Sequence, residues 1–383
     1  MFMRRCLQLA RCGEAGAPPN PMVGAVVVCD GRIIGEGYHR KCGGPHAEVN
    51  AIGSVREKHL LGRSTIYVSL EPCAHYGKTP PRADLIIESG IRRVVIGCTD
   101  PFAKVNGLGI RKLLEAGLEV QVGVLEQECR ELNRRFFTFH EKHRPWITLK
   151  WAQSEDRVIG AYPCPSKEGA KGSEEPECSE DSECSEDSEY SEYSEYSECS
   201  VDSDYSEYSE YSESSDGSSS PSERVGKRLI FSNALTQTLV HRLRARHQAI
   251  LVGTRTALLD NPSLTTRLWP GPNPLRLTID RHGILPPTLH LKDGSTPTVI
   301  YTHESIEEIL ADLYRRGIQS LLVEGGAKLL QSFIDKGLWD EARIETAPIS
   351  LGEGVRAPLL SGGERTGKQV FGRNVIEEWR NSR

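Results

Sequence analysis

A histidine, a glutamate and a cysteine in the N-terminal part of the chain form the pattern with the clearest chemistry. His46 and Glu48 stand two residues apart at the start of a predicted helix, and Pro72 and Cys73 follow a predicted strand. Imidazole and thiolate are ligands that Zn²⁺ prefers, and a catalytic zinc site keeps one position for water. A nearby glutamate can pass a proton from that water to a leaving amine. The pattern therefore predicts hydrolytic removal of an amino group from an aromatic ring, with Glu48 as the catalytic residue.

The usual third ligand is missing from this pattern. In zinc deaminases that edit nucleic acids, a second cysteine comes three residues after the first. Here that residue is Tyr76, which disfavours that class of deaminase.

Longer stretches of the N-terminal part surround these residues, namely PNPMVGAVVV (19–28), GEGYH (35–39), GGPHAEVNA (43–51), YVSLEPCAHYGKTPP (67–81) and DPF (100–102). Together they resemble the deaminase half of the bifunctional riboflavin-biosynthesis deaminase/reductase family. The resemblance covers nearly all of residues 1–145 and implies a cytidine-deaminase-like domain with His46 and Cys73 as zinc ligands. In that family the second zinc cysteine follows the first by nine residues, and that position here is Arg82.

Arg82 is a departure at the metal site itself. A guanidinium has no lone pair for zinc and carries a fixed positive charge, so it is not a ligand. Cys42, His75, Asp84 and Cys98 are the candidates for a replacement. Two readings stay open, a zinc site that is weak or completed elsewhere and a folded domain that has lost its metal, so Zn²⁺ is an uncertain cofactor.

The C-terminal part resembles the reductase half of the same family. The similar segments are LKWAQSED (149–156), HRLRARHQAILVGTRTALLDNPSLTTR (241–267), RLTID (276–280) and LLVEGGAKLLQSFI (321–334). The resemblance implies a dihydrofolate-reductase-like fold that uses NADPH. It implies substrate binding by Arg244, Leu264, Arg267 and Glu324, and cofactor binding by Thr256, Asp260, Gly325, Gly326, Ala327 and Lys328.

Elementary chemistry agrees with that assignment in outline. Arginine forks suit a phosphate dianion, and a Gly-Gly turn between a strand and a helix lets backbone N–H groups approach a phosphate. One departure lies near the nicotinamide side, where the family's tryptophan is replaced by Ile230.

Residues 173–223 differ sharply in composition from the rest of the chain. They contain 19 Asp or Glu, 19 Ser and six Tyr, with no Lys or Arg. Without them, 34 acidic residues stand against 47 basic ones, a net charge of +13 instead of −6. Such a tract cannot bury enough apolar surface to offset its ordering entropy, which predicts a disordered insertion within about residues 162–224. A phosphorylatable interaction tail and a functionless triplet expansion are its two readings.

Apolar periodicity predicts two α/β domains, residues 1–145 and 146–383. In the first, helices alternate with strands after a hairpin at Asp30-Gly31, which predicts a largely parallel sheet covered on both faces. One long helix is expected over residues 126–140. The 11 cysteines are odd in number and fit no disulfide framework, and no stretch is long and apolar enough for a membrane span, so a reducing cytoplasm is expected.

The resemblance implies a bifunctional enzyme, a hydrolase and an oxidoreductase. It would deaminate 2,5-diamino-6-ribosylamino-4(3H)-pyrimidinone 5′-phosphate and then reduce 5-amino-6-(5-phosphoribosylamino)uracil to the ribityl product with NADPH. The alternatives are a reductase with a zinc-deficient remnant domain and a non-enzymatic paralogue or scaffold. The expected partners are phosphorylated pyrimidine small molecules, with no nucleic acid or membrane, and a homo-oligomer is left open.

Excision of residues 173–223 tests the reading of the insertion. The shortened chain should keep its melting temperature within a few degrees and its NADPH turnover, because the tract contributes no apolar packing. Calorimetry and NADPH absorbance measure the two quantities. A large loss of either would mean that the tract packs on a domain or shapes the reductase site.

Overall fold

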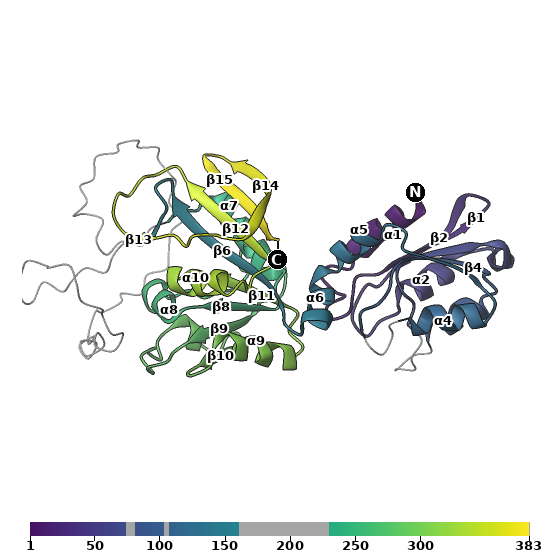
Figure 1. The fold of residues 1–383 in the computed structure, drawn as a ribbon, viewed down its shortest axis with the longest axis horizontal. Helices are drawn as coiled ribbons and strands as arrows, with labels where there is room; N and C mark the ends of the chain where they lie inside the picture. Colours follow the sequence, from purple (N-terminus) through teal and green to yellow (C-terminus); the bar gives the residue numbers. More distant parts are fainter. Residues whose placement is uncertain (74–80, 103–106, 161–229, 383) are drawn as a thin grey trace, which may run out of the picture. The chain divides into compact units, whose positions relative to one another are not determined.

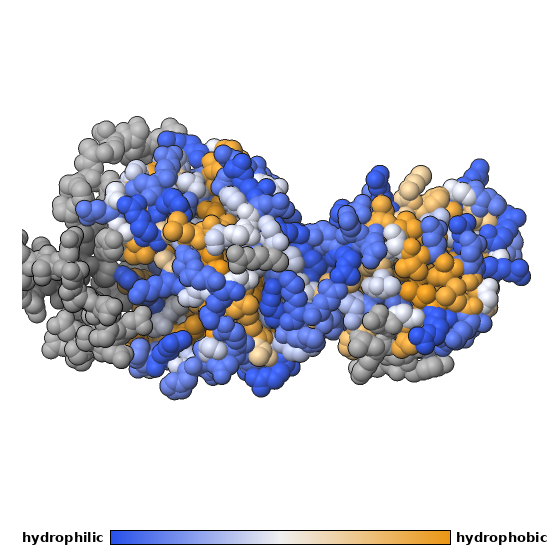
Figure 2. Space-filling model, in the orientation of Figure 1, coloured by the Kyte–Doolittle hydropathy of each residue, from blue (hydrophilic) through white to orange (hydrophobic). Residues whose placement is uncertain are grey.

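Two β-sheets organise the part of the chain that the computed structural model describes, residues 1–73, 81–102, 107–160 and 230–382 (Figure 1). The acidic tract, with its predicted disorder, lies outside these ranges. Polar and charged residues cover much of the visible face (Figure 2). Among the described residues, no helix is long and apolar enough to cross a membrane.

The first sheet has five strands in the order β2-β1-β3-β4-β5. Its strands are β1 (Gly24–Cys29), β2 (Arg32–Tyr38), β3 (Thr65–Leu70), β4 (Arg93–Cys98) and β5 (Glu119–Val122). The helices of this part are α1 (Phe2–Arg11), α2 (Ala47–Ser54), α3 (Arg82–Glu88), α4 (Leu108–Glu115), α5 (Glu126–Leu132) and α6 (Arg134–Lys142), with a 3₁₀ helix at Lys58–Arg63. Strand β1 runs antiparallel to β2, as the predicted hairpin requires, and β3, β4 and β5 are parallel, as the sequence predicts. The antiparallel pairing of β1 with β3 was not predicted.

Alternating side chains cover both faces of this sheet. Val27 of β1 packs in one apolar cluster with residues of α2, α3 and α4. Val26, one residue earlier, packs in another cluster with residues of α1, α5 and α6. Because side chains of a strand alternate between faces, a strand buried on both sides must be apolar throughout. The sheet is therefore the middle of three layers. One of its strands, β3, ends at Leu70, shortly before Cys73.

Glu71 ties the end of β3 to α4. Its side chain is buried, and its carboxylate accepts hydrogen bonds from the backbone N–H groups of Asp100 (3.2 Å), Gly107 (3.1 Å), Gly109 (3.0 Å) and Ile110 (3.3 Å). An anion is stabilised at the N-terminus of a helix. The glutamate of the LEPC motif is therefore a structural anchor rather than a catalytic group.

The second sheet has eight strands in the order β10-β9-β8-β11-β6-β12-β15-β14. They are β6 (Trp146–Ser154), β8 (Ala249–Val252), β9 (Leu275–Ile279), β10 (Thr298–Tyr301), β11 (Ser320–Glu324), β12 (Glu341–Ala347), β14 (Gly363–Phe371) and β15 (Asn374–Asn381), while β7 (Val158–Gly160) pairs with β13 (Val355–Arg356). The helices are α7 (Ala234–Ala245), α8 (Thr254–Asp260), α9 (Ile306–Arg315) and α10 (Ala327–Asp335), with a 3₁₀ helix at His290–Lys292. In this order, each neighbouring pair from β10 across to β12 is parallel. The pairs β12–β15 and β15–β14 are antiparallel.

The two faces of the second sheet have different neighbours. Leu321 and Val323 of β11 pack in a cluster with residues of α9 and α10. Leu322 belongs to a separate cluster, against which Leu243 of α7 packs. Alternation along β11 then places Glu324 on the same face as Leu322, toward α7. This parity brings the predicted substrate-binding glutamate and Arg244 of α7 together.

One expected helix needs correction, and some elements were not predicted. The single helix expected over residues 126–140 is two helices, α5 and α6, separated at Asn133. The Asn133 side chain accepts a hydrogen bond from the Met22 N–H at 2.8 Å and donates one to the Met22 carbonyl at 2.9 Å, so a distant strand entrance holds the break. Helix α8 and the strands after β11 carry no periodic signal that the sequence analysis detected.

Arg276 of β9 is a fully buried cation that orders the segment after the 3₁₀ helix. It donates hydrogen bonds to the Thr298 hydroxyl (2.9 Å), the His290 carbonyl (2.8 Å), the Asp293 carboxylate (2.9 Å) and the Thr296 carbonyl (2.7 Å). A buried charge is tolerated only when it is paired and hydrogen-bonded in this way.

Arg276→Leu should lower the free energy of unfolding by about 3 kcal/mol, because the variant leaves four acceptors, buried or partly buried, without their donor. Urea unfolding measures the change. Arg281→Leu, at an exposed position just after β9, is the matched control and should stay within about 0.5 kcal/mol of the unmodified chain. Similar losses in the two variants would contradict a structural role for Arg276.

Candidate active sites

The N-terminus of α2 presents the two residues of the H-x-E pattern. His46 is the N-cap residue, in extended conformation, and Glu48 lies in the first turn. Glu48 is 2 % exposed, and among the described residues its Oε2 atom has no hydrogen-bond partner. Burial raises the pKa of Glu48 to about 7, although the positive charge of Arg82 opposes this shift. A carboxyl group that titrates near neutrality can both accept and release a proton.

Cys73 and Arg82 are joined through the backbone. The Cys73 carbonyl accepts hydrogen bonds from the N–H groups of Arg82 (3.0 Å) and Ala83 (3.2 Å), so α3 begins against the residue that follows β3. Burial raises the pKa of the Cys73 thiol, the charge of Glu48 raises it further, and the charge of Arg82 lowers it. Glu48, Cys73 and Arg82 therefore lie close enough together for their charges to affect one another.

The described residues do not complete a zinc site around Glu48 and Cys73. Among them, no three His, Cys, Asp or Glu side chains are placed to hold one metal ion. The third family position is occupied by Arg82, which is 5 % exposed and has a side chain that cannot ligate a cation. Of the three zinc-ligand positions that the resemblance implies, the chain therefore keeps two, His46 and Cys73.

The replacement ligands considered from the sequence fare differently. Cys42 is exposed. Asp84 is engaged in an ion pair with Lys112 at 2.5 Å, and the Cys98 thiol donates to a backbone carbonyl at 3.5 Å in the core of the sheet. His75 lies outside the described residues.

A buried ion pair marks the second candidate site. The Arg244 guanidinium donates from Nε to Oε1 of Glu324 at 3.0 Å and from Nη2 to Oε2 at 2.7 Å. Both side chains are largely buried, 13 % and 10 % exposed. Burial alone would raise the pKa of Glu324, but Arg244, Lys150 and His241 together lower it, so this carboxylate stays ionised. The structure thus brings together two of the predicted substrate-binding residues.

Lys150 and His241 also belong to this site, and the sequence analysis missed both. Lys150 of β6 pairs in register with Glu324 of β11. Burial lowers the pKa of Lys150, whereas Glu324 and Glu345 oppose that shift. His241 lies one helical turn before Arg244 on α7. A charged residue inside the apolar strand WITLKWAQS was a usable signal for Lys150.

The segment that carries Leu264 and Arg267 runs beside Arg244. Arg244 Nη1 donates to the Thr265 carbonyl at 3.3 Å. The Leu264 side chain is buried, and its backbone adopts the left-handed conformation, at φ +55°, in which a leucine is strained. Arg267 is exposed, and no ion pair joins it to a carboxylate among the described residues, so its guanidinium is available to an anion.

The turn between β11 and α10 forms a cradle with α8. Gly325 and Gly326 both have positive φ, +71° and +73°. A Cβ atom on Gly325 would lie 3.1 Å from Cγ2 of Thr256, and one on Gly326 would lie 3.3 Å from Oγ1 of the same residue. The backbone is therefore open here only because both residues are glycines, and α10 starts directly after them.

This cradle fits the phosphate groups of a dinucleotide, because the first N–H groups of a helix bind anions. Ala327 and Lys328 occupy the first turn of α10, and Asp260 is the last residue of α8. The residues expected to bind NADPH therefore lie on adjoining elements. Ile230 is 65 % exposed.

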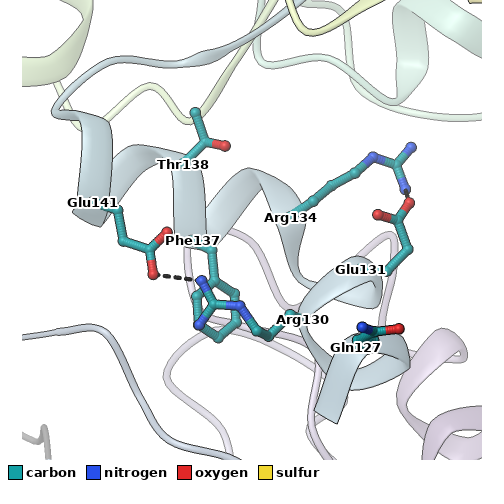
Figure 3. Close-up of a pocket in the computed structure, with 7 residues that line it drawn as sticks. All are labelled: Gln127, Arg130, Glu131, Arg134, Phe137, Thr138 and Glu141. Atoms are coloured by element: carbon teal, nitrogen blue, oxygen red, sulfur yellow. Dashed lines mark hydrogen bonds and ion pairs between the residues drawn. The ribbon is translucent and has the colours of Figure 1, made fainter. Parts of the chain in front are cut away.

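A separate surface pocket lies along α5 and α6 (Figure 3). Arg130 pairs with Glu141 at 2.6 Å and stacks over the Phe137 ring at 4.2 Å, while Arg134 pairs with Glu131 at 3.0 Å. Both arginines that line the pocket are thus already paired with carboxylates. It contains no residue of either candidate site, and we assign no reaction to it.

Comparison with known proteins places the chain in a family. The family model "Cytidine and deoxycytidylate deaminase zinc-binding region" matches residues 1–98, and the model "RibD C-terminal domain" matches residues 199–373. The riboflavin biosynthesis protein RibD of Aquifex aeolicus is 34 % identical over 377 residues, which cover 92 % of this chain and 88 % of that protein. The chain belongs to the RibD family of riboflavin biosynthesis proteins.

Other members of the RibD family support the assignment over the full length. RibD of Bacillus amyloliquefaciens is 35 % identical over 390 residues, covering 95 % of this chain and 88 % of that protein. A solved Thermotoga maritima structure, a diaminohydroxyphosphoribosylaminopyrimidine deaminase/5-amino-6-(5-phosphoribosylamino)uracil reductase, aligns with a TM-score of 0.74 at 33 % identity and covers 99 % of this chain and 97 % of that one. The matches confirm the expected fold, a cytidine-deaminase-like part followed by a reductase part.

Membership of the RibD family also decides between the functional alternatives. Both halves match, in the family order and over nearly the full length of each relative. A bifunctional enzyme of riboflavin biosynthesis is therefore supported over a reductase-only chain and over a non-enzymatic scaffold. Arg82 stays a local departure within a RibD framework.

Arg82→Cys should increase the zinc bound per chain to about one equivalent, because it adds the third protein ligand of a catalytic zinc site. Metal analysis after dialysis measures it. Arg92 is an exposed arginine that follows α3 in the sequence, so Arg92→Cys controls for the added thiol and should leave the bound zinc unchanged. Glu48→Ala in the Arg82→Cys background should keep the metal, since Glu48 is not a ligand. Stoichiometric zinc in the unmodified chain would mean that another side chain completes the site.

Proposed function

We propose that this chain catalyses two consecutive steps of riboflavin biosynthesis. The first part deaminates 2,5-diamino-6-ribosylamino-4(3H)-pyrimidinone 5′-phosphate, and the second reduces 5-amino-6-(5-phosphoribosylamino)uracil to its ribityl product with NADPH. The Thermotoga maritima relative is a deaminase/reductase that aligns over nearly the whole chain, and this supports the pair of reactions. The observation that carries the reductase assignment is the buried Arg244–Glu324 pair beside an exposed Arg267.

The reductase residues have separate tasks in this proposal. Arg267 binds the substrate phosphate, since an arginine fork matches a phosphate dianion. Arg244 binds Glu324, and together they fix one wall of the substrate site. Leu264, which is buried on the same segment as Arg267, contacts the substrate in this proposal.

The cofactor is proposed to lie over the glycine turn. Gly325, Gly326, Ala327 and Lys328 would hold its phosphates, with Thr256 and Asp260 of α8 at the adjoining edge. NADPH supplies the hydride when it is bound, and the protein supplies the orientation.

In the deaminase part, Glu48 is proposed as the group that holds and moves the proton. Its burial, and a pKa raised by that burial to about 7, suit a carboxyl that alternates between acid and base. His46 and Cys73 are proposed as metal ligands. Because the described residues do not complete a zinc site, we derive no step through a metal.

The remaining assignments are also proposals. We place the division between the two domains at residues 145 and 146, next to the start of β6. Small phosphorylated pyrimidines are the proposed partners, and the cytoplasm is the proposed location. An assembly of identical chains stays a prediction.

Kinetics of Arg267→Ala test the reductase assignment. The variant should raise the KM for the phosphorylated substrate by about 10- to 100-fold, as expected for the loss of a charged hydrogen bond, while the KM for NADPH stays within about two-fold. NADPH oxidation, followed optically, gives both constants. Arg315→Ala, at the exposed end of α9, is the control and should leave both constants unchanged.

Two outcomes would count against the proposal. Equal changes in both KM values for Arg267→Ala would remove its role in substrate binding. No NADPH oxidation by the unmodified chain, with the ribosylamino-uracil phosphate as substrate, would contradict the reductase function. Ammonia release from the diaminopyrimidinone measures the deaminase step independently.

A further inference from the structure

One face of α7 holds the segment from Leu264 to Leu268 through two side chains. His241 is 4 % exposed and lies one turn before Arg244, so both point the same way from the helix. Nδ1 of His241 faces the backbone N–H of Leu268 at 3.5 Å. Arg244 binds the Thr265 carbonyl of the same segment at 3.3 Å.

We infer that His241 is a positioning residue of the reductase site. By accepting the Leu268 N–H, it holds the segment that presents Leu264 and Arg267 to the phosphorylated substrate. This inference rests on the proposed reductase function.

The charge state of His241 suits this task. Burial, together with the neighbouring cations Arg244 and Arg267, lowers its pKa to about 4, while Glu324 and a backbone hydrogen bond with Thr265 oppose the shift. The imidazole is therefore neutral at neutral pH and keeps a ring nitrogen that can accept a hydrogen bond. A cation at this position would repel the two neighbouring arginines, Arg244 and Arg267.

The segment needs such support because its backbone is strained. Leu264 is held at φ +55°, a conformation that is strained for a leucine and persists only when its surroundings enforce it. The next part of the segment is fixed by Asn273, which lies further along the same connection between α8 and β9. Asn273 Oδ1 accepts the Thr266 N–H at 2.9 Å and the Thr266 hydroxyl at 2.9 Å. The stretch between Leu264 and Leu268, including Arg267, is thus held from both sides.

Three substitutions at His241 separate positioning from simple packing. His241→Leu removes the acceptor and should raise the KM for the phosphorylated substrate by about three- to ten-fold, while the KM for NADPH stays unchanged. His241→Asn places an amide oxygen near the position of Nδ1 and should retain most of the substrate affinity. His241→Gln, whose amide reaches the position of Nε2 instead, should resemble His241→Leu.

A double-mutant cycle tests whether His241 acts through Arg267. In an Arg267→Ala background, His241→Leu should raise the substrate KM by less than two-fold, because the residue that it positions is absent. Full additivity of the two changes would overturn the inference.

Hydrogen exchange gives a readout that does not depend on turnover. In the full-length chain without substrate, His241→Leu should speed amide exchange in residues 264–269, while exchange in β8 stays as it is. Unchanged exchange in that segment, or His241→Gln outperforming His241→Asn, would overturn the positioning role. If the unmodified chain turns over no substrate but the exchange result holds, the proposed function fails and the positioning role stands.

Discussion

The ion pair between Arg244 and Glu324 is the constraint on which the reductase site depends. Both charges are largely removed from water, which costs several kcal/mol for each ion unless geometry and hydrogen bonding compensate. The two parallel hydrogen bonds at 3.0 and 2.7 Å provide that compensation. Loss of either partner would leave the other charge buried and uncompensated. Helix α7 therefore cannot shift relative to β11, and every group that α7 contacts inherits a fixed position.

Strand alternation explains why the other charged groups gather at the same place. Glu324 and Lys150 are paired in register on neighbouring parallel strands, so their side chains leave the sheet on the same face. That face is the one α7 covers, whereas the opposite face packs against α9 and α10. The glycine turn comes directly after Glu324, so this carboxylate and the glycine turn lie at one end of one strand.

The sequence predicts those elements whose burial is visible in the residue types, such as the hairpin at Asp30-Gly31, which joins β1 and β2. It carries no such signal for α8 or for the strands after β11. The break at Asn133 could not be predicted, since it depends on hydrogen bonds to Met22, 111 residues away. The site residues inferred from the resemblance came without their supports. His241 acts through a contact between α7 and a distant loop, and no local pattern reports such a contact.

The two halves of the chain use the same pair of residue types to opposite effect. In the reductase part, Glu324 has both oxygens bound by Arg244, and its pKa is lowered, so it remains an anion. In the deaminase part, Arg82 also opposes the effect of burial on Glu48, yet Oε2 of Glu48 has no hydrogen-bond partner among the described residues and its pKa rises to about 7. Burial is similar in the two sites, so the charge and hydrogen bonds of Arg244, together with the charges of Lys150 and His241, make the difference. A glutamate held by a bidentate arginine fixes structure, and one left partly unsatisfied can exchange a proton.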